Sequence, residues 1–229
     1  MAKNKTTLVI LTRNEITGMK ALFAKIPFHR VDETIVVDYQ SVDGTKEFIQ
    51  RHKIKLINQT KPGRGEAFRL AVSHARGNFL VFFSPDGNED PTDIPQLIQG
   101  LSQGYDLVIA SRFMAGARNE EDDQWLKFRA WANQAFTWLA NICFHGRLSD
   151  SINGYRAITK DAFSRLQLDA DGYAIEWQMS MRALKLKFKI KEFPTREGNR
   201  LGGFSGSKAL PSGWLFLKVF LKELFDQKI

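Results

Sequence analysis

The sequence predicts an α/β protein whose central sheet is mostly parallel and is flanked by helices. Short apolar runs alternate with amphipathic segments through the first half of the chain, which is the pattern of strands and helices in alternation. The chain has 229 residues, of which 43% are hydrophobic and 25% are charged, so it is long enough to bury one substantial core. We therefore expect one domain over residues 1–229, with an amphipathic terminal helix in residues 211–229.

Five apolar runs are predicted to be strands of this sheet. Their residues are mostly apolar in succession, which is typical of strands that are buried on both faces. The runs are residues 7–11, 34–37, 55–57, 79–83 and 107–110. Helices are predicted between them over residues 17–25, 44–52, 66–75 and 95–104. Asp93 before the last of these helices and Gly104 at its end are suited to capping it.

The second half predicts longer helices and one basic loop. In a helix over residues 125–144, five apolar side chains share one face: Phe128, Trp131, Ala135, Trp138 and Ile142. Further helices are predicted over residues 161–166 and 173–184, and a strand over residues 188–193. Residues 196–212 are rich in Gly, Ser and basic side chains and predict a long loop of the kind that closes over ligands. A broad apolar helix over residues 214–225 carries Lys218 and Lys222 on one side.

The formal net charge of +8 predicts attraction to an acidic partner, either a phosphorylated substrate or anionic lipid headgroups. Nucleic acid is not expected, because Lys and Arg are dispersed and no zinc-finger or RNA-recognition pattern is present. Cys143 lies in an apolar run and is expected to be a small buried hydrophobe. The first residues lack the pattern of a secretory signal, so a cytoplasmic location is expected.

Polar residues directly follow three of the predicted strands. They are residues 12–15 after the first strand, residues 38–45 after the second and residues 84–88 after the fourth. Because ligands bind beyond the carboxyl ends of parallel strands, these segments are expected to form a binding site. Carboxylates there need a hydroxyl donor or a divalent cation as partner. The alternative is that Asp43-Gly44-Thr45 is a turn and helix cap and that Asp86-Gly87 is a turn.

These segments belong to a series of motifs that resembles the inverting family-two glycosyltransferases of GT-A fold, and among them the polyprenyl-phosphate sugar transferases. The resemblance covers residues 8–208. Its motifs are LTRNE (residues 11–15), VDYQSVDGT (37–45), KPGRGEA (61–67), DSINGYR (150–156) and GYAIE (172–176). The resemblance implies a nucleotide-sugar-binding half over residues 1–112, and an acceptor-side half with a mobile loop over residues 113–210.

The resemblance implies a donor site for a UDP or GDP sugar. Glu15 and Asp38 would contact the nucleobase or the ribose, and Arg200 and Lys208 would close over the diphosphate. For Lys208 the alternative is a solvent-facing lysine. The residues implied at the donor are Thr12, Asn14, Glu15, Asp38, Ser41, Asp43, Lys61, Gly65, Ser84, Arg200 and Lys208.

The resemblance also implies a site for Mg²⁺ or Mn²⁺ at Asp86 and Asn88. The family's aspartate-x-aspartate motif reads Ser84-Pro85-Asp86 here, so the first carboxylate is missing. In the polyprenyl branch the second aspartate and an amide two residues further on bind the metal, and Asp86 with Asn88 fits that arrangement. Glu89 and Asp90 are either further oxygen ligands or a solvated pair that caps the next helix. The metal would neutralise the charge that grows on the leaving diphosphate.

On the acceptor side, Arg112 and Arg129 resemble positions that hold a lipid phosphate, a role that suits the planar guanidinium group. For Arg129 the alternative is a surface arginine. A phosphate acceptor would attack the anomeric carbon without a base, whereas a sugar hydroxyl would need Glu176 or Asp150 to take its proton. The catalytic residues expected are Asp86, Arg112, Arg129 and Glu176.

Three functions therefore remain open. The first is transfer of a sugar to polyprenyl (dolichyl or undecaprenyl) phosphate at the cytoplasmic face of a membrane. The second is transfer to a saccharide hydroxyl in the assembly of cell-surface polysaccharide. The third is a non-catalytic nucleotide-binding module, since Ser84 and Tyr39 stand where acidic residues are usual. A sugar-nucleotide pyrophosphorylase is not expected, because residues 12–15 lack its Gly-rich phosphate loop.

Two aromatic helices bear on attachment to a membrane. Trp and Phe lie beside Lys in residues 125–144 and in the terminal helix, a composition suited to the headgroup region. The alternative is that both helices pack on the protein core or on a second subunit, as in a homodimer. Peripheral contact with the inner face of the cell membrane would account for the basic charge and a lipid-phosphate acceptor together.

Overall fold

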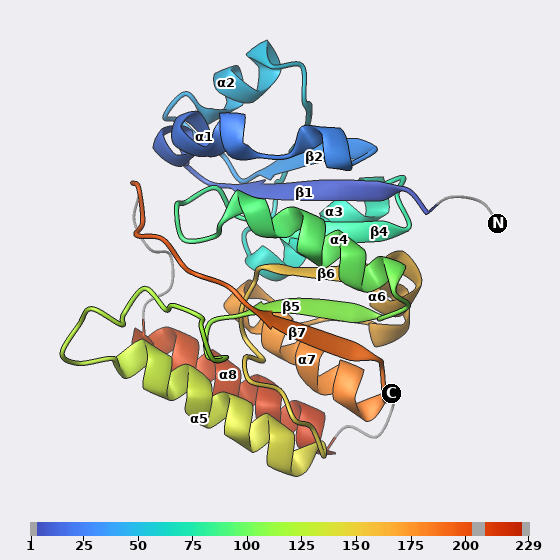
Figure 1. Ribbon diagram of the computed structural model, residues 1–229, viewed down its shortest axis with the longest axis vertical. Coiled ribbons are helices and arrows are strands. Elements are labelled where there is room, and N and C mark those ends of the chain that lie inside the picture. Colours follow the sequence, from blue (N-terminus) through green and yellow to red (C-terminus); the bar gives the residue numbers. More distant parts are fainter. Residues whose placement is uncertain (1–3, 203–208, 226–229) are drawn as a thin grey trace.

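The strands form one sheet that is covered by helices on both faces (Figure 1). The computed structural model describes residues 4–202 and 209–225. Within these residues seven strands lie in the order β3-β2-β1-β4-β6-β5-β7, and β6 is antiparallel to both of its neighbours while the other pairs are parallel. The strands are β1 (Thr6–Thr12), β2 (Glu33–Asp38), β3 (Lys55–Asn58), β4 (Phe79–Phe83), β5 (Leu107–Ser111), β6 (Arg156–Thr159) and β7 (Ile190–Pro194).

The helices alternate with the strands in the first half and gather in the second, as predicted. The α-helices are α1 (Ile16–Leu22), α2 (Thr45–Arg51), α3 (Arg64–His74), α4 (Ile94–Ser102), α5 (Phe128–Cys143), α6 (Lys160–Leu166), α7 (Ile175–Lys185) and α8 (Ala209–Phe225). Short 3-10 helices are η1 (Phe23–Lys25), η2 (Phe28–Arg30), η3 (Pro91–Asp93) and η4 (Gly172–Ala174). The α/β fold class and all five strands predicted in the first half are confirmed.

One strand was missed and one boundary was predicted wrongly. β6 was not predicted as a strand, because its four residues carry only a short apolar run after the DSINGYR motif. The loop over residues 196–212 was predicted too long, since α8 already begins at Ala209. The segment is rich in Gly, Ser and basic residues with little periodicity, so the start of the helix could not be recognised from the sequence.

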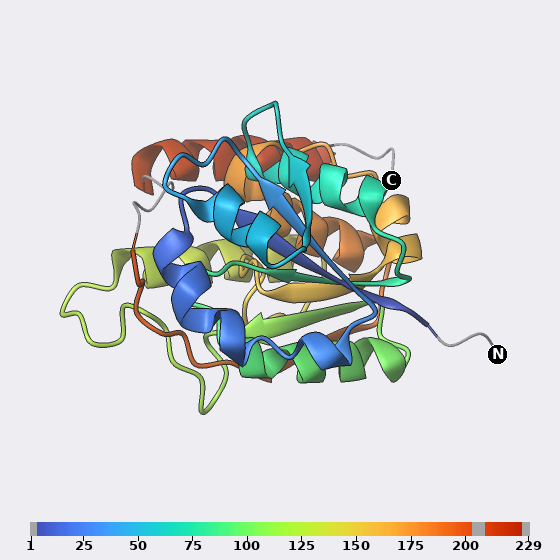
Figure 2. The ribbon, with the colours of Figure 1, turned by 90° about the horizontal axis from the view of Figure 1, so that it is seen from above.

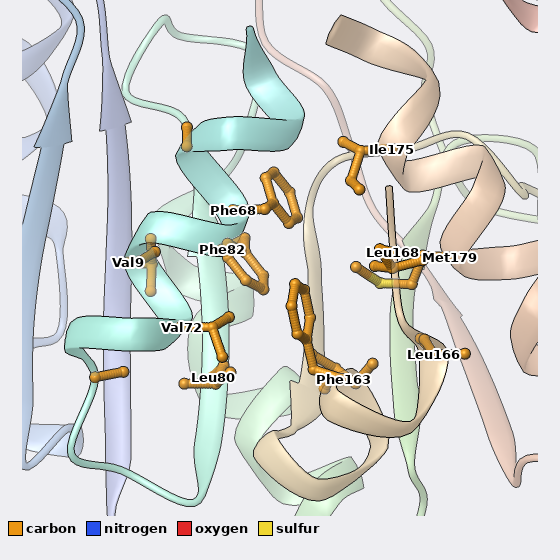
Figure 3. Close-up of a cluster of buried hydrophobic side chains, with 14 of the residues drawn as sticks. Val9, Phe68, Val72, Leu80, Phe82, Phe163, Leu166, Leu168, Ile175 and Met179 are labelled. Atoms are coloured by element: carbon orange, nitrogen blue, oxygen red, sulfur yellow. The ribbon is translucent and has the colours of Figure 1, made fainter. Parts of the chain in front are cut away.

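The core lies on both faces of the sheet, which explains why the strands are apolar in succession. On one face Phe68 of α3 stacks on Phe82 of β4 at 4.0 Å between ring centroids, and Phe163 and Met179 complete the cluster (Figure 3). On the other face Met19 of α1 and residues of α2 and α4 pack against the strands. Figure 2 shows α1 and α4 on the opposite side of the sheet from α3 and α7. Burial on both faces favours apolar side chains at successive strand positions.

A third cluster joins α5, α7 and α8 at the end of the molecule furthest from α2 (Figure 1). Trp177 of α7 is fully buried at its centre, and Phe216 and Phe220 of α8 pack around it. Cys143 is half-buried at the edge of this cluster, less enclosed than expected. Asp93 precedes α4, but its side chain accepts a hydrogen bond from Thr195 Oγ1 (2.6 Å) and does not cap the helix.

The aromatic face of α5 does not pack on the core. Phe128, Trp131, Trp138 and Ile142 are between 51% and 65% exposed. α5 instead contacts the protein through its opposite side, where Ala130, Thr137 and Ala140 are buried. Phe136 and Leu139, on another side of α5, pack against the cluster around Trp177, so α5 does pack on the core while the face that carries Trp131 and Trp138 stays exposed.

Candidate active site

The carboxyl ends of three parallel strands meet at one edge of the sheet. In the strand register Thr12 of β1 lies beside Asp38 of β2, and Ile10 lies beside Phe83 at the end of β4. The segments that follow these strands are therefore neighbours, as the sequence predicted. They carry most of the side chains expected at the donor site.

Asp38 is fully buried, and its carboxylate is surrounded by donors of the protein itself. Thr12 Oγ1 donates to Oδ2 (2.8 Å), and the backbone N–H of Ser41 donates to Oδ1 (3.0 Å). The hydroxyl of Ser41 donates to the same carboxylate, and Lys46 Nζ lies 3.9 Å from Oδ1. The structure thus gives Asp38 a role in organising the loop after β2, with Thr12 and Ser41 as its partners.

Asn14 and Asp43 connect the loops after β1 and β2. The N–H of Asn14 donates to Ser41 Oγ (2.8 Å), while its Oδ1 accepts from the N–H of Val42 (2.9 Å). Asp43 accepts from the N–H groups of Ile16 and Thr45, both at 3.0 Å. Burial opposes ionisation of Asp43, but these hydrogen bonds outweigh it and lower the pKa of its carboxyl. Asp43 therefore accepts from the first N–H groups of α1 and α2, although the N-cap residue of α2 is Gly44.

Arg200 lies between two carboxylates of the donor site. Its guanidinium donates to Glu15 Oε1 and to Asp86 Oδ2, each at 2.8 Å. The loop that carries Arg200 is also held by its backbone, because the N–H of Leu201 donates to the carbonyl of Asp86 (2.8 Å). Burial raises the pKa of Glu15 to about 7, although the charge of Arg200 acts in the opposite direction. Lys208, also expected here, lies outside the described residues.

Asp86 and Asn88 are joined by a hydrogen bond, and each carries a side-chain oxygen that a cation could bind. The backbone N–H of Asn88 donates to Asp86 Oδ1 (3.1 Å), and the Asn88 amide donates to Glu120 Oε2 (2.8 Å). Asn88 Oδ1 is buried and accepts no hydrogen bond from any described residue. A buried carbonyl oxygen without a donor is a costly arrangement unless something else binds it. The pair therefore fits a hard cation such as Mg²⁺ or Mn²⁺.

The neighbouring acids do not extend this pair into a larger cluster. Glu89 is buried and accepts from the N–H of Ser84 (2.6 Å), and burial raises the pKa of its carboxyl well above the usual range. Asp90 accepts from the N–H of Thr92 (2.9 Å) and caps η3. In the described part of the chain, no three His, Cys, Asp or Glu side chains gather as a metal site. Any metal here would rely on Asp86, Asn88 and the oxygens of its ligand.

Arg64 is a site residue that the sequence interpretation overlooked. It begins α3, forms an ion pair with Glu176 Oε1, and donates from Nη1 to Ser84 Oγ (3.3 Å). Glu176 is buried, and its Oε2 has no partner among the described residues. The charge of Glu176 outweighs burial and raises the pKa of Arg64. A basic residue inside the KPGRGEA motif was the available signal.

Lys61 and Gly65 show different surroundings. Lys61 is exposed on the loop before α3. Gly65 lies against the carbonyl oxygen of Ala170, and a Cβ atom at this position would come within 2.1 Å of it. Gly65 therefore has a packing role, because it lets the first turn of α3 approach the segment before η4.

Arg112 is engaged by protein carboxylates. Its Nε and Nη2 form a bidentate pair with Asp150 at 2.7 and 3.0 Å, and Nη1 lies 3.8 Å from Glu197. Burial alone would raise the pKa of Asp150, but Arg112 outweighs it, so the carboxyl pKa is lowered. Both carboxylate oxygens of Asp150 accept hydrogen bonds from Arg112, whereas Oε2 of Glu176 has no partner among the described residues, so Glu176 is the better placed of the two candidate bases. Arg129 is half-exposed and lies within 4.0 Å of Glu120 and Glu121.

The sheet order, the acidic edge and the loop that carries Arg200 define a protein of GT-A fold. Residues 7–167 match the sequence profile of Glycosyl transferase family 2, and the chain belongs to this family. The predicted family and the predicted fold are thereby confirmed.

Two curated relatives illustrate the family. The glycosyltransferase AglJ of Haloferax volcanii is 31% identical over 166 residues, which cover 70% of this chain and 52% of AglJ. The dolichol-phosphate mannosyltransferase of Pyrococcus furiosus is 27% identical over 215 residues, which cover 89% of this chain and 59% of that protein. The chain thus matches between half and three fifths of the length of these relatives.

A solved structure resembles the fold over nearly the whole chain. Glucosyl-3-phosphoglycerate synthase from Mycobacterium tuberculosis, crystallised with Mn²⁺, UDP and glucosyl-3-phosphoglycerate, superposes with a TM-score of 0.74. The match covers 97% of this chain and 81% of the synthase, at 21% sequence identity. At this identity the likeness establishes the fold.

Proposed function

We propose that this protein transfers a sugar from a nucleotide-diphosphate sugar to a polyprenyl phosphate at the cytoplasmic face of a membrane. The observation that carries the donor half is the pairing of Asp86 with the unpartnered Oδ1 of Asn88, opposite Arg200. The relative named as a dolichol-phosphate mannosyltransferase supports the acceptor half. A UDP or GDP donor is consistent with both features.

On the donor side, Asp86 and Asn88 would hold Mg²⁺ or Mn²⁺. When bound, the metal would neutralise charge on the diphosphate. Arg200 lies within hydrogen-bond distance of Asp86, so its guanidinium is placed to donate to the same diphosphate. Ser84 stands where the family has the first aspartate of its metal motif, and its hydroxyl is neutral. Arg64 therefore contacts a hydroxyl group there instead of a carboxylate.

Transfer to a phosphate would need no base from the protein. An ionised phosphate oxygen would form its bond to the anomeric carbon as the bond from that carbon to the diphosphate oxygen breaks, and the configuration would invert. Arg129 is half-exposed beside Glu120, which in turn contacts Asn88, so it is near enough to the donor to orient an anionic acceptor. Arg112 would act only through Nη1, which also lies 3.8 Å from Glu197, since Asp150 occupies its other nitrogens.

A second candidate function is transfer to a saccharide hydroxyl. The unpartnered Oε2 of Glu176 favours it, because a buried carboxylate oxygen without a donor is suited to accept the proton of an attacking hydroxyl. A third candidate is a nucleotide-binding module without catalysis. It would follow from the replacement of the first aspartate of the metal motif by Ser84.

A transfer assay separates these candidates. Purified protein with Mg²⁺ or Mn²⁺ would be given UDP and GDP sugars together with either polyprenyl phosphate or an oligosaccharide. We expect sugar on the polyprenyl phosphate, loss of at least about a hundredfold in Asp86→Ala, and little change in Asp161→Ala, an exposed carboxylate on α6. Glu176→Gln should retain most of the transfer to phosphate. Transfer to the oligosaccharide that Glu176→Gln abolishes would instead establish the second function, and binding without transfer would establish the third.

A further inference from the structure

The side chain of Asn88 is held by a residue of a distant loop. Its amide nitrogen donates to Oε2 of Glu120 at 2.8 Å, and Glu120 lies 32 residues further along the chain, between β5 and α5. The amide oxygen, Oδ1, is buried and accepts no hydrogen bond from any described residue. The two ends of this amide group therefore differ. The protein binds the nitrogen, and the oxygen is available to a ligand.

The carboxylate of Glu120 favours one of the two orientations that the Asn88 amide can adopt. An amide has nearly the same shape at both ends, but its nitrogen is a donor and its oxygen an acceptor. If the amide turned over, Oδ1 would face a carboxylate oxygen, and two acceptors would meet without a proton between them. The nitrogen would then take the place of the buried oxygen. Because Mg²⁺ and Mn²⁺ prefer oxygen ligands, the turned amide would no longer suit either cation.

Glu120 is itself held in place by the segment that follows β7. Its backbone N–H donates to Oε2 of buried Glu197 at 3.0 Å, and its side-chain Oε2 lies 4.0 Å from Nη1 of Arg129. The same segment holds the backbone of Asn88, because the N–H of Gly198 donates to the Asn88 carbonyl oxygen (2.9 Å). The carboxylate and the amide are thus anchored to one segment, which fixes their relative position.

We propose that Glu120 is a positioning residue of the metal site, which keeps Oδ1 of Asn88 turned toward the cation. The inference rests on the part of the proposed function that assigns Mg²⁺ or Mn²⁺ to Asp86 and Asn88. Residues that orient the ligands of a metal typically contribute a factor of about 10 to 100 in metal affinity. Glu120 would act through the amide and would not bind the cation.

Calorimetric titration of the full chain tests this role without an acceptor. UDP and GDP would each be titrated at a series of Mn²⁺ concentrations, to find the Mn²⁺ concentration that gives half of the metal-dependent binding. We expect Glu120→Ala to raise this concentration by about 10- to 100-fold, because the amide would be free to turn. Glu120→Gln keeps an oxygen that can accept from the Asn88 amide, so it should restore most of the affinity.

A matched control lies on the same loop. Asp123→Ala also removes one carboxylate, but Asp123 is exposed and pairs with Arg118 instead of Asn88. This variant should require the same Mn²⁺ concentration as the wild type. Thermal melting without metal shows whether each variant is folded. Glu120→Ser, whose side chain is also too short to reach the amide, replaces Glu120→Ala if that variant is unstable.

The effect of Glu120 should depend on the presence of the Asn88 amide. In the Asn88→Ala background, a further Glu120→Ala substitution should change the half-saturating Mn²⁺ concentration by no more than about twofold, because no amide remains to be oriented. A carboxylate that attracted the cation only by its charge would behave differently. Its loss would be equally large in Glu120→Gln and Glu120→Ala, and it would persist without Asn88.

Three results would overturn the proposal: wild-type metal dependence in Glu120→Ala, equal losses in Glu120→Gln and Glu120→Ala, or additive losses in the double variant. Nucleotide binding by the wild type that does not respond to Mn²⁺ would overturn the proposed metal site together with the role of Glu120. No acceptor is present in this experiment, so a failure to transfer sugar to polyprenyl phosphate is a separate result.

Discussion

At the scale of single residues, two arginines organise the carboxylates of the site in different ways. Arg64 pairs with buried Glu176 and is itself largely buried, whereas Arg200 reaches Glu15 and Asp86 from a loop. A buried ion pair is costly to break because the remaining partner keeps its charge without compensation. An ion pair on a loop is easier to exchange for a ligand. Arg64 therefore supports the site permanently, and Arg200 is available to a diphosphate.

Replacement of Arg64 by Ala should lower the free energy of unfolding by about 3 kcal/mol, because Glu176 would remain buried without its partner. The double variant Arg64→Ala/Glu176→Gln should recover a large part of this loss, since it removes the uncompensated charge as well. Urea denaturation of the two single variants and the double variant measures the coupling. Additive losses would show that the ion pair does not support the fold.

Glu15 should make stability depend on pH. Its folded pKa is raised by burial to about 7 from an ordinary value of 4.5, so the folded state retains a proton that the unfolded state releases. The resulting stabilisation is complete below about pH 4.5 and is lost as the pH rises to about 7, by up to about 3 kcal/mol. Glu15→Gln should lack this component. The test is denaturation of both proteins across this range without metal or nucleotide, and parallel profiles would contradict the assignment.

At the scale of elements, a buried carboxylate holds α8 in place. Glu223 accepts from Gln178 Nε2 at 2.9 Å, Arg182 Nε at 2.8 Å and Lys185 Nζ at 3.0 Å, all from α7. The aromatic cluster around Trp177 supplies the apolar part of the same contact. α8 is therefore fixed by one charged and one apolar interaction while its other side stays exposed.

Glu223→Ala should destabilise the protein by about 3 to 5 kcal/mol, because Arg182 would lose its buried partner. Glu223→Gln keeps a hydrogen-bond acceptor and should cost less. Glu47→Ala on α2, an exposed glutamate, should change stability by no more than about 0.5 kcal/mol. The measurement is chemical denaturation, and a loss in Glu223→Ala no larger than in the α2 control would contradict this account of α8.

At the scale of the whole molecule, the sheet gathers the donor residues from segments far apart in the chain. Glu15 follows β1, Asp86 follows β4 and Arg200 follows β7. The guanidinium of Arg200 donates one hydrogen bond to each of the two carboxylates. A ligand that binds across them would connect both halves of the chain. Binding should therefore stabilise the entire fold and not a single loop.

UDP or GDP with Mn²⁺ should raise the melting temperature by about 5 to 10 °C at concentrations near a hundred times the dissociation constant. Chelation of the metal, or the Asp86→Ala substitution, should remove most of this increase because the diphosphate would lose its bridging cation. A thermal-shift series with and without chelator measures it. An increase that persists unchanged under chelation would exclude Asp86 and Asn88 as metal ligands.

The sequence by itself determined the alternation of strands and helices. Strands that are buried on both faces consist of apolar residues in succession, and such runs are recognised in the sequence without the structure. The sequence also placed the polar motifs after those strands, and the family follows from their order. The metal ligands, the acceptor arginines and the attachment to a membrane stay predictions. Lys61 and Gly65 were assigned to the donor site because they lie in the KPGRGEA motif. Packing against the carbonyl oxygen of Ala170 explains the glycine at position 65.

Only the tertiary structure decided which side of each helix is covered. The periodicity of α5 shows one aromatic face and one polar face, and a pattern alone suggests that the aromatic face is buried. Phe136 and Leu139, on another side of α5, pack against Trp177 and Phe216 instead, and the aromatic face is exposed. The partnership of Arg64 with Glu176, 112 residues apart, likewise depends on the folding of α3 against α7. Contacts of this kind depend on three-dimensional packing, which the order of residues along the chain does not contain.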